Sequence, residues 1–265
     1  MKKLLLILFL LLGISSYAQD TEYLKFVSWN IQNIGKSKSD STLYYIANKL
    51  KNYDIVAVQE VSTSEFGAQA IAKLDDQLDR TGSSWDYSIS ASTSGDGSER
   101  YAYLYKKSRV TLESTGLEKS LDTLINREPF RGVFLFNKKQ YYIFTLHLVP
   151  TNKNPELEVE KLSIIPKNYK NKNIIICGDF NLSSSDKSYN GLRSTMVDVL
   201  KKTKTSLKMK PDQNGEVLNA EYDNFWVSNN TIHKEGQVLL FYKDFKTLSL
   251  ARKVSDHCPI FLKIK

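Results

Sequence analysis

Apolar and polar positions along the chain follow two periods, which predicts a mixed α/β protein. Short apolar or alternating runs are typical of β-strands, and between them lie stretches with the i, i+3, i+4 apolar spacing of amphipathic helices. The expected helices are 41–50, 66–78, 157–169 and 192–202. The expected strands are 24–32, 55–59, one within 83–94, 101–106, 110–117, 130–136, 140–148, 174–177, 222–228, 238–242 and 259–264.

The order of these elements predicts two packed sheets. Helices alternate with strands toward both ends of the chain, whereas the central strands follow one another through short turns, as antiparallel hairpins do. This order is typical of a four-layer α/β/β/α sandwich, in which two mixed sheets pack face to face with helices outside. Because no Pro-, Gly- or Ser-rich linker divides residues 19–265, we expect a single domain.

The first 18 residues have the features of a signal peptide. Lys2 and Lys3 precede the apolar run 4–12, and Ser16 and Ala18 are small residues before a cleavage site. The apolar run is too short for a good membrane span. We therefore expect cleavage after Ala18 and export, to the periplasm or out of the cell, with no stable membrane anchor afterwards. The alternative is an uncleaved anchor.

The composition shows an excess of basic over acidic residues, and two cysteines. The chain contains 37 Lys and Arg against 29 Asp and Glu, which favours a polyanionic partner such as nucleic acid. Export permits a disulfide between Cys177 and Cys258. Both lie in apolar runs, however, where cysteine behaves as a small hydrophobe. We expect two free, buried thiols that bind no metal, since a Mg²⁺-type site prefers oxygen.

The candidate chemistry lies at the ends of expected strands. Asn30, Glu60 and His147 each end such a strand, Gly-Asp-Phe-Asn at 178–181 closes another, and Ser-Asp-His at 255–257 opens the last. A carboxylate, carboxamide or imidazole at a strand end costs burial energy unless it is paired or functional. Five such strand ends predict one polar site at the rim of a sheet, with carboxylates for a hard cation and imidazoles for proton transfer.

Together these segments resemble the endonuclease/exonuclease/phosphatase superfamily, and within it the deoxyribonuclease I branch. Any one segment alone would be weak, and the resemblance depends on their order and spacing from about residue 24 to residue 265. The segments are Asn30, Glu60, Glu99, Arg127-Glu128-Pro129, His147, Gly178-Asp179-Phe180-Asn181, Tyr222-Asp223 and Ser255-Asp256-His257.

The resemblance implies a divalent metal site. Glu60 is the implied metal carboxylate, and Asn30 and Asp256 complete or support its shell. Mg²⁺ is the expected ion, Mn²⁺ is a possible substitute, and Ca²⁺ is a possible additional ion. A plainer alternative exists for two of these residues: a salt bridge for Glu60 and a turn for Asn30.

Two histidines are the implied acid and base. By resemblance, Glu99 partners His147 and Asp223 partners His257, and a carboxylate partner fixes the tautomer and raises the pKa of an imidazole. One imidazole would activate water while the other protonates the leaving oxygen of a phosphodiester. Which imidazole does which stays open at this point. Asp179 is implied to orient the attacking water, or to act as the base itself.

Three further residues are implied to contact the substrate. Asn181 and Arg127 match positions that bind the scissile phosphate, and a guanidinium suits phosphate because it can donate two parallel hydrogen bonds. Arg100 follows the Gly- and Ser-rich loop 92–98 and is a candidate for contact with a DNA groove. The third histidine, His233, lies in a polar stretch and needs no role.

The substrate does not follow from the superfamily alone. His147, the Arg127 segment and export favour a monomeric DNA endonuclease of low sequence specificity, with RNA as a possible further substrate. Two departures stand against full equivalence with deoxyribonuclease I: Ser62 replaces an arginine that reaches DNA, and the cysteines do not reproduce the disulfides of the secreted animal enzymes. The alternatives are a phospholipid phosphodiesterase of the sphingomyelinase type, another superfamily phosphatase, or a binding protein without catalysis.

Overall fold

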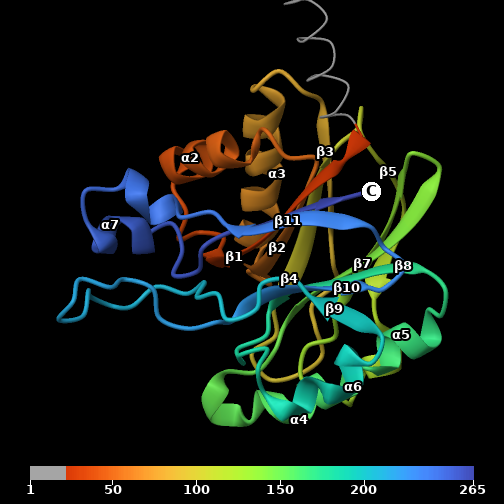
Figure 1. Ribbon diagram of the computed structural model, residues 1–265. Coiled ribbons are helices and arrows are strands. Elements are labelled where there is room, and N and C mark those ends of the chain that lie inside the picture. Colours follow the sequence, from red (N-terminus) through yellow and green to blue (C-terminus); the bar gives the residue numbers. More distant parts are fainter. Residues whose placement is uncertain (1–21) are drawn as a thin grey trace, which may run out of the picture.

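Two six-stranded sheets form the centre of the computed structural model, which describes residues 22–265 (Figure 1). The expected signal peptide lies outside the described residues. Sheet A has the strand order β11-β12-β1-β2-β4-β3, and sheet B has the order β5-β6-β7-β8-β10-β9. The strands of sheet A are β1 (Leu24–Ile34), β2 (Ile55–Val61), β3 (Trp85–Ile89), β4 (Arg100–Lys106), β11 (His233–Val238) and β12 (Ile260–Ile264). Those of sheet B are β5 (Thr111–Leu117), β6 (Phe130–Phe136), β7 (Lys139–His147), β8 (Asn173–Asp179), β9 (Met196–Asp198) and β10 (Asp223–Ser228).

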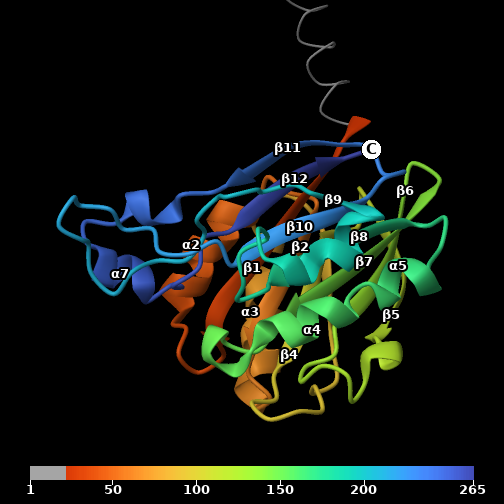
Figure 2. The same cartoon turned by 60° about the horizontal axis from the view of Figure 1, so that its bottom comes forward.

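Helices cover the outer face of each sheet, which confirms the expected α/β/β/α layers (Figures 1 and 2). On sheet A these are α2 (Asp40–Leu50) and α3 (Glu65–Asp79), with the short α7 (Leu248–Arg252) toward one end. On sheet B they are α4 (Pro155–Lys161), α5 (Ile164–Asn168) and α6 (Asn190–Arg193). Ser39 caps α2, because its side chain accepts a hydrogen bond from the Thr42 backbone N–H.

The core follows from the alternation of residues along the strands. Successive side chains of a strand point to opposite faces, so Phe26 of β1 lies between the sheets while Val27 lies under the helices. Likewise, Ile143 of β7 faces sheet A and Phe144 faces α4 and α5. Three buried apolar layers result, one between the sheets and one under each set of helices.

Two expected helices differ from the structure. The stretch 157–169 forms α4 and α5 with a break at Leu162–Ser163, which leaves Pro166 in the first turn of α5, where a missing N–H is tolerated. The expected helix 192–202 is wrong. Its residues form the end of α6 and then β9, in which Met196 and Asp198 are buried and Val197 between them is exposed.

The expected strand 238–242 is also misplaced. The strand at this edge of sheet A is β11, which ends at Val238, and a 3₁₀ helix follows at Phe241–Asp244. The strand sequence, His-Lys-Glu-Gly-Gln-Val, carries little apolar pattern, and the strand lies at the edge of the sheet, where charged residues discourage pairing with another chain.

The strand directions bring the site residues together. In each sheet the two central strands run parallel, with Asn30 of β1 opposite Gln59 of β2 and His147 of β7 opposite Asp179 of β8. Gly178 allows the last pair to approach, because its φ is +129° and a Cβ there would lie 2.0 Å from the Leu146 carbonyl oxygen.

The structure also tests the expectations for the cysteines and for membrane spans. Cys177 and Cys258 are both buried and free, as expected. Burial raises the pKa of the Cys177 thiol to about 12, so this thiol is protonated at neutral pH. Within residues 22–265, no helix has the length and apolar character needed to cross a membrane.

Candidate active site

Two imidazoles converge on one buried carboxylate at the end of β8. The Nε2 atoms of His147 and His257 lie 3.4 and 3.5 Å from Oδ2 of Asp179, whose side chain is almost fully buried. The other carboxylate oxygen of Asp179 accepts a hydrogen bond of 3.0 Å from the Asn181 backbone N–H. Asp179 therefore sits at the centre of the site, between the two histidines.

Each imidazole has a second carboxylate on its other nitrogen, which confirms the expected pairs. Nδ1 of His147 lies 2.9 Å from Glu99, and Nδ1 of His257 lies 2.7 Å from Asp223. A carboxylate in this position accepts the Nδ1 hydrogen and leaves Nε2 for the chemistry. Thr205, which sequence reasoning missed, donates a 2.6 Å hydrogen bond to Asp223 and so orients the second pair.

The electrostatics of both imidazoles favour the protonated form. Burial lowers the pKa of His257, but the carboxylates of Asp223 and Asp179 outweigh burial, and the pKa lies well above its ordinary value of 6.5. For His147, burial is likewise outweighed by Glu99 and Asp179, and the pKa is raised. Each imidazole can therefore carry a proton to a leaving group, and the one that acts as a base must first lose its proton.

Glu60 and Asn30 lie beside this centre, on sheet A. Asn30 Nδ2 donates to Glu60 Oε1 at 2.9 Å and to Asp179 Oδ2 at 3.1 Å, and so joins the two sheets. Glu60 has a φ of +60°, a strained value for a residue with a side chain. This strain accompanies an irregularity in β2 that brings the Glu60 carboxylate back toward the Asn33 backbone N–H, from which it accepts a 2.9 Å hydrogen bond.

The donor set around Glu60 fits a hard divalent cation. Oδ1 of Asn30 is buried and meets no hydrogen-bond partner among the described residues, which is costly unless another group satisfies it. The Glu60 carboxylate is partly exposed and is linked to Asp179 through the Asn30 amide nitrogen. The oxygens available to a cation here are those of Glu60 and Oδ1 of Asn30, unpartnered within residues 22–265, and oxygen is the ligand that Mg²⁺ prefers.

A second set of metal-type ligands lies nearby but suits proton transfer better. Atoms of Asp179, Asp223 and His257 all lie within 4.8 Å of one another. In this set the His257 Nδ1 is already engaged by Asp223 at 2.7 Å, and an imidazole is a less favourable ligand than oxygen for Mg²⁺. The second set is therefore better suited to acid–base chemistry, and a metal at Glu60 and its neighbours stays a prediction.

Asp256 lies at the edge of this region. Its Oδ2 accepts a 2.9 Å hydrogen bond from Gln32 and lies 3.4 Å from an Arg252 nitrogen. The Asp256 carboxylate thus already has side-chain partners in the protein, and neither of them is Asn30 or Glu60, which are hydrogen-bonded to each other. A part for Asp256 in the metal shell stays a prediction.

Lys38 is a buried cation that sequence reasoning missed. Its ammonium group interacts electrostatically with the carboxylates of Glu60 and Asp256. Its Nζ donates a hydrogen bond of 3.3 Å to the Lys253 carbonyl. Burial lowers the pKa of Lys38 to about 8, although the two carboxylates oppose that shift. No sequence signal separates this lysine from its many exposed counterparts.

The two residues expected to bind phosphate also hold the backbone of the site. Arg127 is buried, and it donates to the carbonyl of His147 at 2.8 Å and to that of Leu148 at 2.6 Å. Asn181 also donates to Leu148, at 3.0 Å. These bonds fix the chain just after β7 and engage two of the three Arg127 nitrogens. Phosphate contact by either residue stays a prediction.

The loops around the site form its two walls. Beside Glu60 lies a groove of about 470 Å³ that includes Glu99 and the hydroxyl residues Ser62 and Ser64. Arg100, the candidate DNA contact, begins β4 next to Glu99 and is half-buried, with a buried Nε that meets no partner among the described residues.

The second wall lies beside His257. The Tyr222 ring stacks on the His257 imidazole, with centroids 6.3 Å apart. A groove of about 340 Å³ continues from there toward Lys208 and Arg252. Arg252 donates a 2.7 Å hydrogen bond to the Leu207 carbonyl and so ties this wall to α7.

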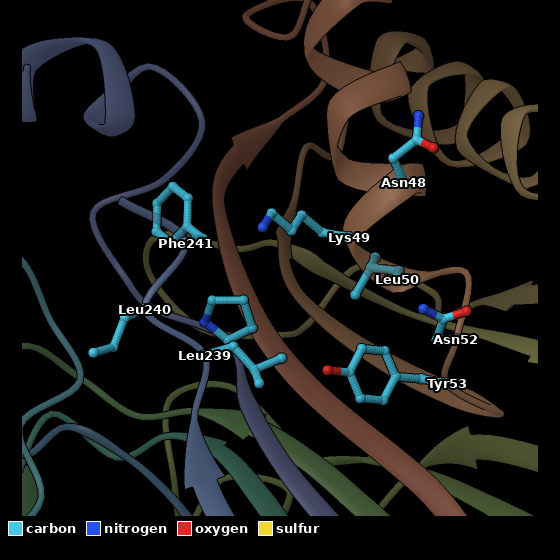
Figure 3. Close-up of a pocket in the computed structure, with 9 residues that line it drawn as sticks. Asn48, Lys49, Leu50, Asn52, Tyr53, Leu239, Leu240 and Phe241 are labelled. Carbon is cyan, nitrogen blue, oxygen red and sulfur yellow. The ribbon is translucent and has the colours of Figure 1, made fainter. Parts of the chain in front are cut away.

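A further hollow lies away from the histidines, between the end of α2 and the segment after β11 (Figure 3). It has a volume of about 380 Å³, and Figure 3 shows Lys49, Tyr53 and Phe241 around it. Its lining includes neither a carboxylate nor an imidazole. It therefore offers no acid–base pair, and the chemistry belongs to the site at the sheet ends.

Comparison with known proteins agrees with this geometry. Residues 27–257 match the model of the Endonuclease/Exonuclease/phosphatase family. The chain is 25% identical to Deoxyribonuclease-1 of Bos taurus, over 95% of both chains, and 29% identical to Deoxyribonuclease-1 of Homo sapiens, over 66% of both.

Solved structures show the same fold at lower identity. D. rerio TDP2 complexed with single strand DNA product has a TM-score of 0.66 at 18% identity, covering 92% of this chain and 99% of that one. A mannosyl-6-phosphatase of Bacteroides thetaiotaomicron has a TM-score of 0.64 at 18% identity, covering 91% and 99%. From the match over most of its length and the acid–base site described above, the chain belongs to the endonuclease/exonuclease/phosphatase family of hydrolases.

Proposed function

We propose that this protein is a metal-dependent endonuclease that hydrolyses DNA phosphodiester bonds with little sequence specificity. The observation that carries the proposal is the pair of carboxylate-bound imidazoles whose Nε2 atoms both lie within 3.5 Å of Asp179, next to Glu60. Hydrolysis of a phosphodiester needs one group to take a proton from water and another to give one to the leaving oxygen. The two imidazoles can supply both.

The residues of the chain divide the work by position. Nε2 of one imidazole, in its neutral form, takes the proton of the attacking water, and Nε2 of the other, in its protonated form, donates to the leaving oxygen. Glu99 and Asp223 hold the two rings in the required tautomer. Each ring has a carboxylate on Nδ1 and Asp179 at Nε2, so either can take either role in this proposal. Asp179 lies between them, where it can orient water.

Glu60 and Asn30 would hold the cation, with Asp256 as a further candidate. A bound Mg²⁺ or Mn²⁺ would neutralise the charge that develops on the phosphate oxygens. Ca²⁺ at a separate structural site also belongs to this proposal. Lys38 would add a fixed positive charge to the same side of the site.

Three observations support DNA as the substrate. Two relatives that match 95% or more of the chain bear the name Deoxyribonuclease-1, one structural neighbour was solved with a single-strand DNA product, and the chain has a net charge of +8. We include RNA as a possible second substrate and a monomer as the working form. A phosphatase is a second candidate, because the mannosyl-6-phosphatase neighbour has the same fold.

We also propose that residues 1–18 direct export and are then removed. The basic start and short apolar run support this proposal. The test is the N-terminal sequence of protein recovered from a cell fraction outside the cytoplasm. Recovery of chains beginning at Gln19 is the expected result, and an intact Met1 would contradict cleavage.

The function is tested first by nicking of supercoiled plasmid with the mature protein. We expect nicking with Mg²⁺, none with EDTA, and a rate lower by about two to four powers of ten for His257→Ala with Mg²⁺. Sphingomyelin and a sugar phosphate serve as parallel substrates. Hydrolysis of either one by a folded protein that leaves plasmid intact would replace the nuclease proposal with the corresponding esterase.

A further inference from the structure

A small polar cluster lies between the two sheets, directly behind the site. Its members are Ser28 of β1, Gln59 of β2, Thr145 of β7 and Cys177 of β8, all of which are buried. The Gln59 amide is at its centre: Nε2 donates to Thr145 Oγ1 at 2.6 Å and to Ser28 Oγ at 3.0 Å. One amide group thus joins sheet A to sheet B.

The cluster is unusual for its surroundings. The layer between the sheets otherwise consists mainly of aliphatic and aromatic side chains, such as Phe26, Tyr103 and Ile143. Oε1 of Gln59 is buried and meets no hydrogen-bond partner among residues 22–265 that the structure describes. A buried amide with an unsatisfied oxygen costs stability, so a purely structural benefit is a poor explanation for Gln59.

Every strand of the cluster leads directly into the active site. Asn30 comes two residues after Ser28, Glu60 one residue after Gln59, His147 two residues after Thr145, and Asp179 two residues after Cys177. Residues i and i+2 of a strand point to the same face. On β1, β7 and β8 the cluster and the site are therefore consecutive layers on the same strand ends, and on β2 the irregularity and the positive φ at Glu60 take the place of this alternation.

The active site itself is divided between the sheets. Asn30 and Glu60 belong to sheet A, whereas His147 and Asp179 belong to sheet B. Contacts within the site cross the same gap, including the 3.1 Å bond between Asn30 and Asp179. Their geometry depends on how far one sheet is displaced along the other.

We propose that Gln59 is a positioning residue, which sets the offset between the two sheets and so aligns the metal side of the site with its acid–base side. Apolar contacts between sheets have no fixed direction. The Gln59 amide instead makes one 2.6 Å hydrogen bond across to β7 of sheet B, and its 3.0 Å bond to Ser28 holds the amide itself in place on sheet A. A misplacement of about 1 Å is enough to cost about 10²-fold in rate. The inference rests on the proposed function for its rate readout only.

The test variant is Gln59→Met, which keeps the length of the side chain and removes both hydrogen bonds. We expect a folded protein with a Tm within about 4 °C of wild type, because the unsatisfied amide oxygen is removed as well. We expect kcat for plasmid nicking to fall at least about tenfold, with KM changed less than kcat. Thr145→Val should have a similar effect, and Thr145→Ser, which keeps the acceptor, should retain the wild-type rate.

Tyr103→Phe is the matched control. The Tyr103 hydroxyl also joins the sheets, through bonds of 2.8 Å to the Phe130 carbonyl and 2.9 Å to the Ile143 carbonyl, but it belongs to β4, which carries neither Asn30 nor Glu60. We expect this variant to lower Tm and to keep kcat. Gln59→Met should do the reverse, and a merely structural role for Gln59 would make the two variants alike.

A double-mutant cycle and a crystal structure complete the test. If Gln59 acts through Thr145, the double variant Gln59→Met/Thr145→Val should be no slower than the worse single variant. In the crystal structure of Gln59→Met, Asn30 Nδ2 and Asp179 Oδ2 should lie beyond hydrogen-bond distance. This readout holds even if DNA is not the substrate. An unchanged Asn30–Asp179 contact, or a kcat within twofold of wild type, would overturn the proposal.

Discussion

At the scale of single residues, the two carboxylate–imidazole pairs set the chemistry. His147 and His257 both lie within 3.5 Å of Asp179 through Nε2, while the third histidine, His233, is on the edge strand β11. We predict that His147→Ala and His257→Ala each lower the nicking rate by about two to four powers of ten, the usual contribution of acid–base catalysis. His233→Ala is the control and should keep the wild-type rate. Near-full activity in both site variants would contradict the mechanism.

The same pairs make stability depend on pH in metal-free protein. Burial lowers the pKa of His257, but Asp223 and Asp179 outweigh it, so the folded-state pKa lies well above 6.5. Protonation of His257 therefore stabilises the fold fully below pH 6.5, and this stabilisation is lost as the pH rises through the raised folded-state pKa.

We predict that Tm measured in EDTA falls as the pH rises from 6.5, and that the fall is smaller in Asp223→Asn, which removes the charge that raises the pKa. Thermal unfolding of both proteins at pH 6 to 9 is the measurement. Equal pH dependence in the two proteins would show that the Asp223–His257 pair does not contribute.

At the scale of elements, the segment after Asn181 shows how the chain is held without disulfides. Arg193 of α6 donates to the carbonyls of Ser184 and Asp186, the latter at 2.9 Å, and to the Asn190 side chain at 2.7 Å. These bonds close the segment that leads away from the active site. The Arg193 guanidinium thus links the two ends of this segment through hydrogen bonds.

We predict that Arg193→Ala destabilises the protein by about 0.5–1.5 kcal/mol, the usual net contribution of a hydrogen bond, because the bond to Ser184 is half-buried and the other two are exposed. Limited proteolysis should cut within 183–190 faster than in wild type. Lys187→Ala, which removes an exposed cation from the same segment, is the control for charge and should leave both readouts unchanged. Faster cleavage in both variants would point to charge instead of the hydrogen bonds.

The elements that were predictable from sequence are those with a full apolar pattern. The buried strands of both sheets and the helices α2 and α3 follow from periodicity, as does the layer order. The error at 192–202 arose because Leu192, Met196 and Leu200 repeat every four residues and imitate a helical face. In the structure residues 196–198 form a strand because they pair with β10. A strand partner about 30 residues away in the sequence leaves no signal in the local pattern.

The site was predictable where a motif marks a strand end, and not where contacts come from elsewhere. Both carboxylate–imidazole pairs were expected and are found. Lys38, Gln59 and Thr205 were missed, because each depends on partners at least 18 residues away in the sequence. The positive φ of Glu60 was not predictable either, since glutamate has no preference for that conformation.

At the scale of the whole molecule, the balance of charge bears on substrate binding. The chain carries 37 basic and 29 acidic residues. Binding of a basic protein to DNA releases counterions. The logarithm of the binding constant therefore falls linearly with the logarithm of the salt concentration, with a slope of about −0.9 for each phosphate contact. We predict that the plasmid nicking rate at low DNA concentration falls at least about tenfold between 50 and 200 mM salt.

The control for salt is a small diester, bis(p-nitrophenyl) phosphate, which offers a single phosphate. Its hydrolysis by the same protein should change much less over the same salt range. A parallel loss of both activities would mean that salt acts on the catalytic site or on the fold, and not on contacts with neighbouring phosphates of a polymer.

The arrangement of the two pairs about Asp179 has a consequence for the products. A nucleic-acid strand has a direction. The two imidazole–carboxylate pairs, however, are alike, because each directs an Nε2 atom toward Asp179 and has a carboxylate on Nδ1. The asymmetry comes from the walls: Tyr222 stands against His257, and the hydroxyl-lined groove with Ser62 opens beside Glu60. For the proposed nucleic-acid substrate, these unlike walls are the feature that would fix which way a strand runs through the site, and with it which of the two new ends keeps the phosphate.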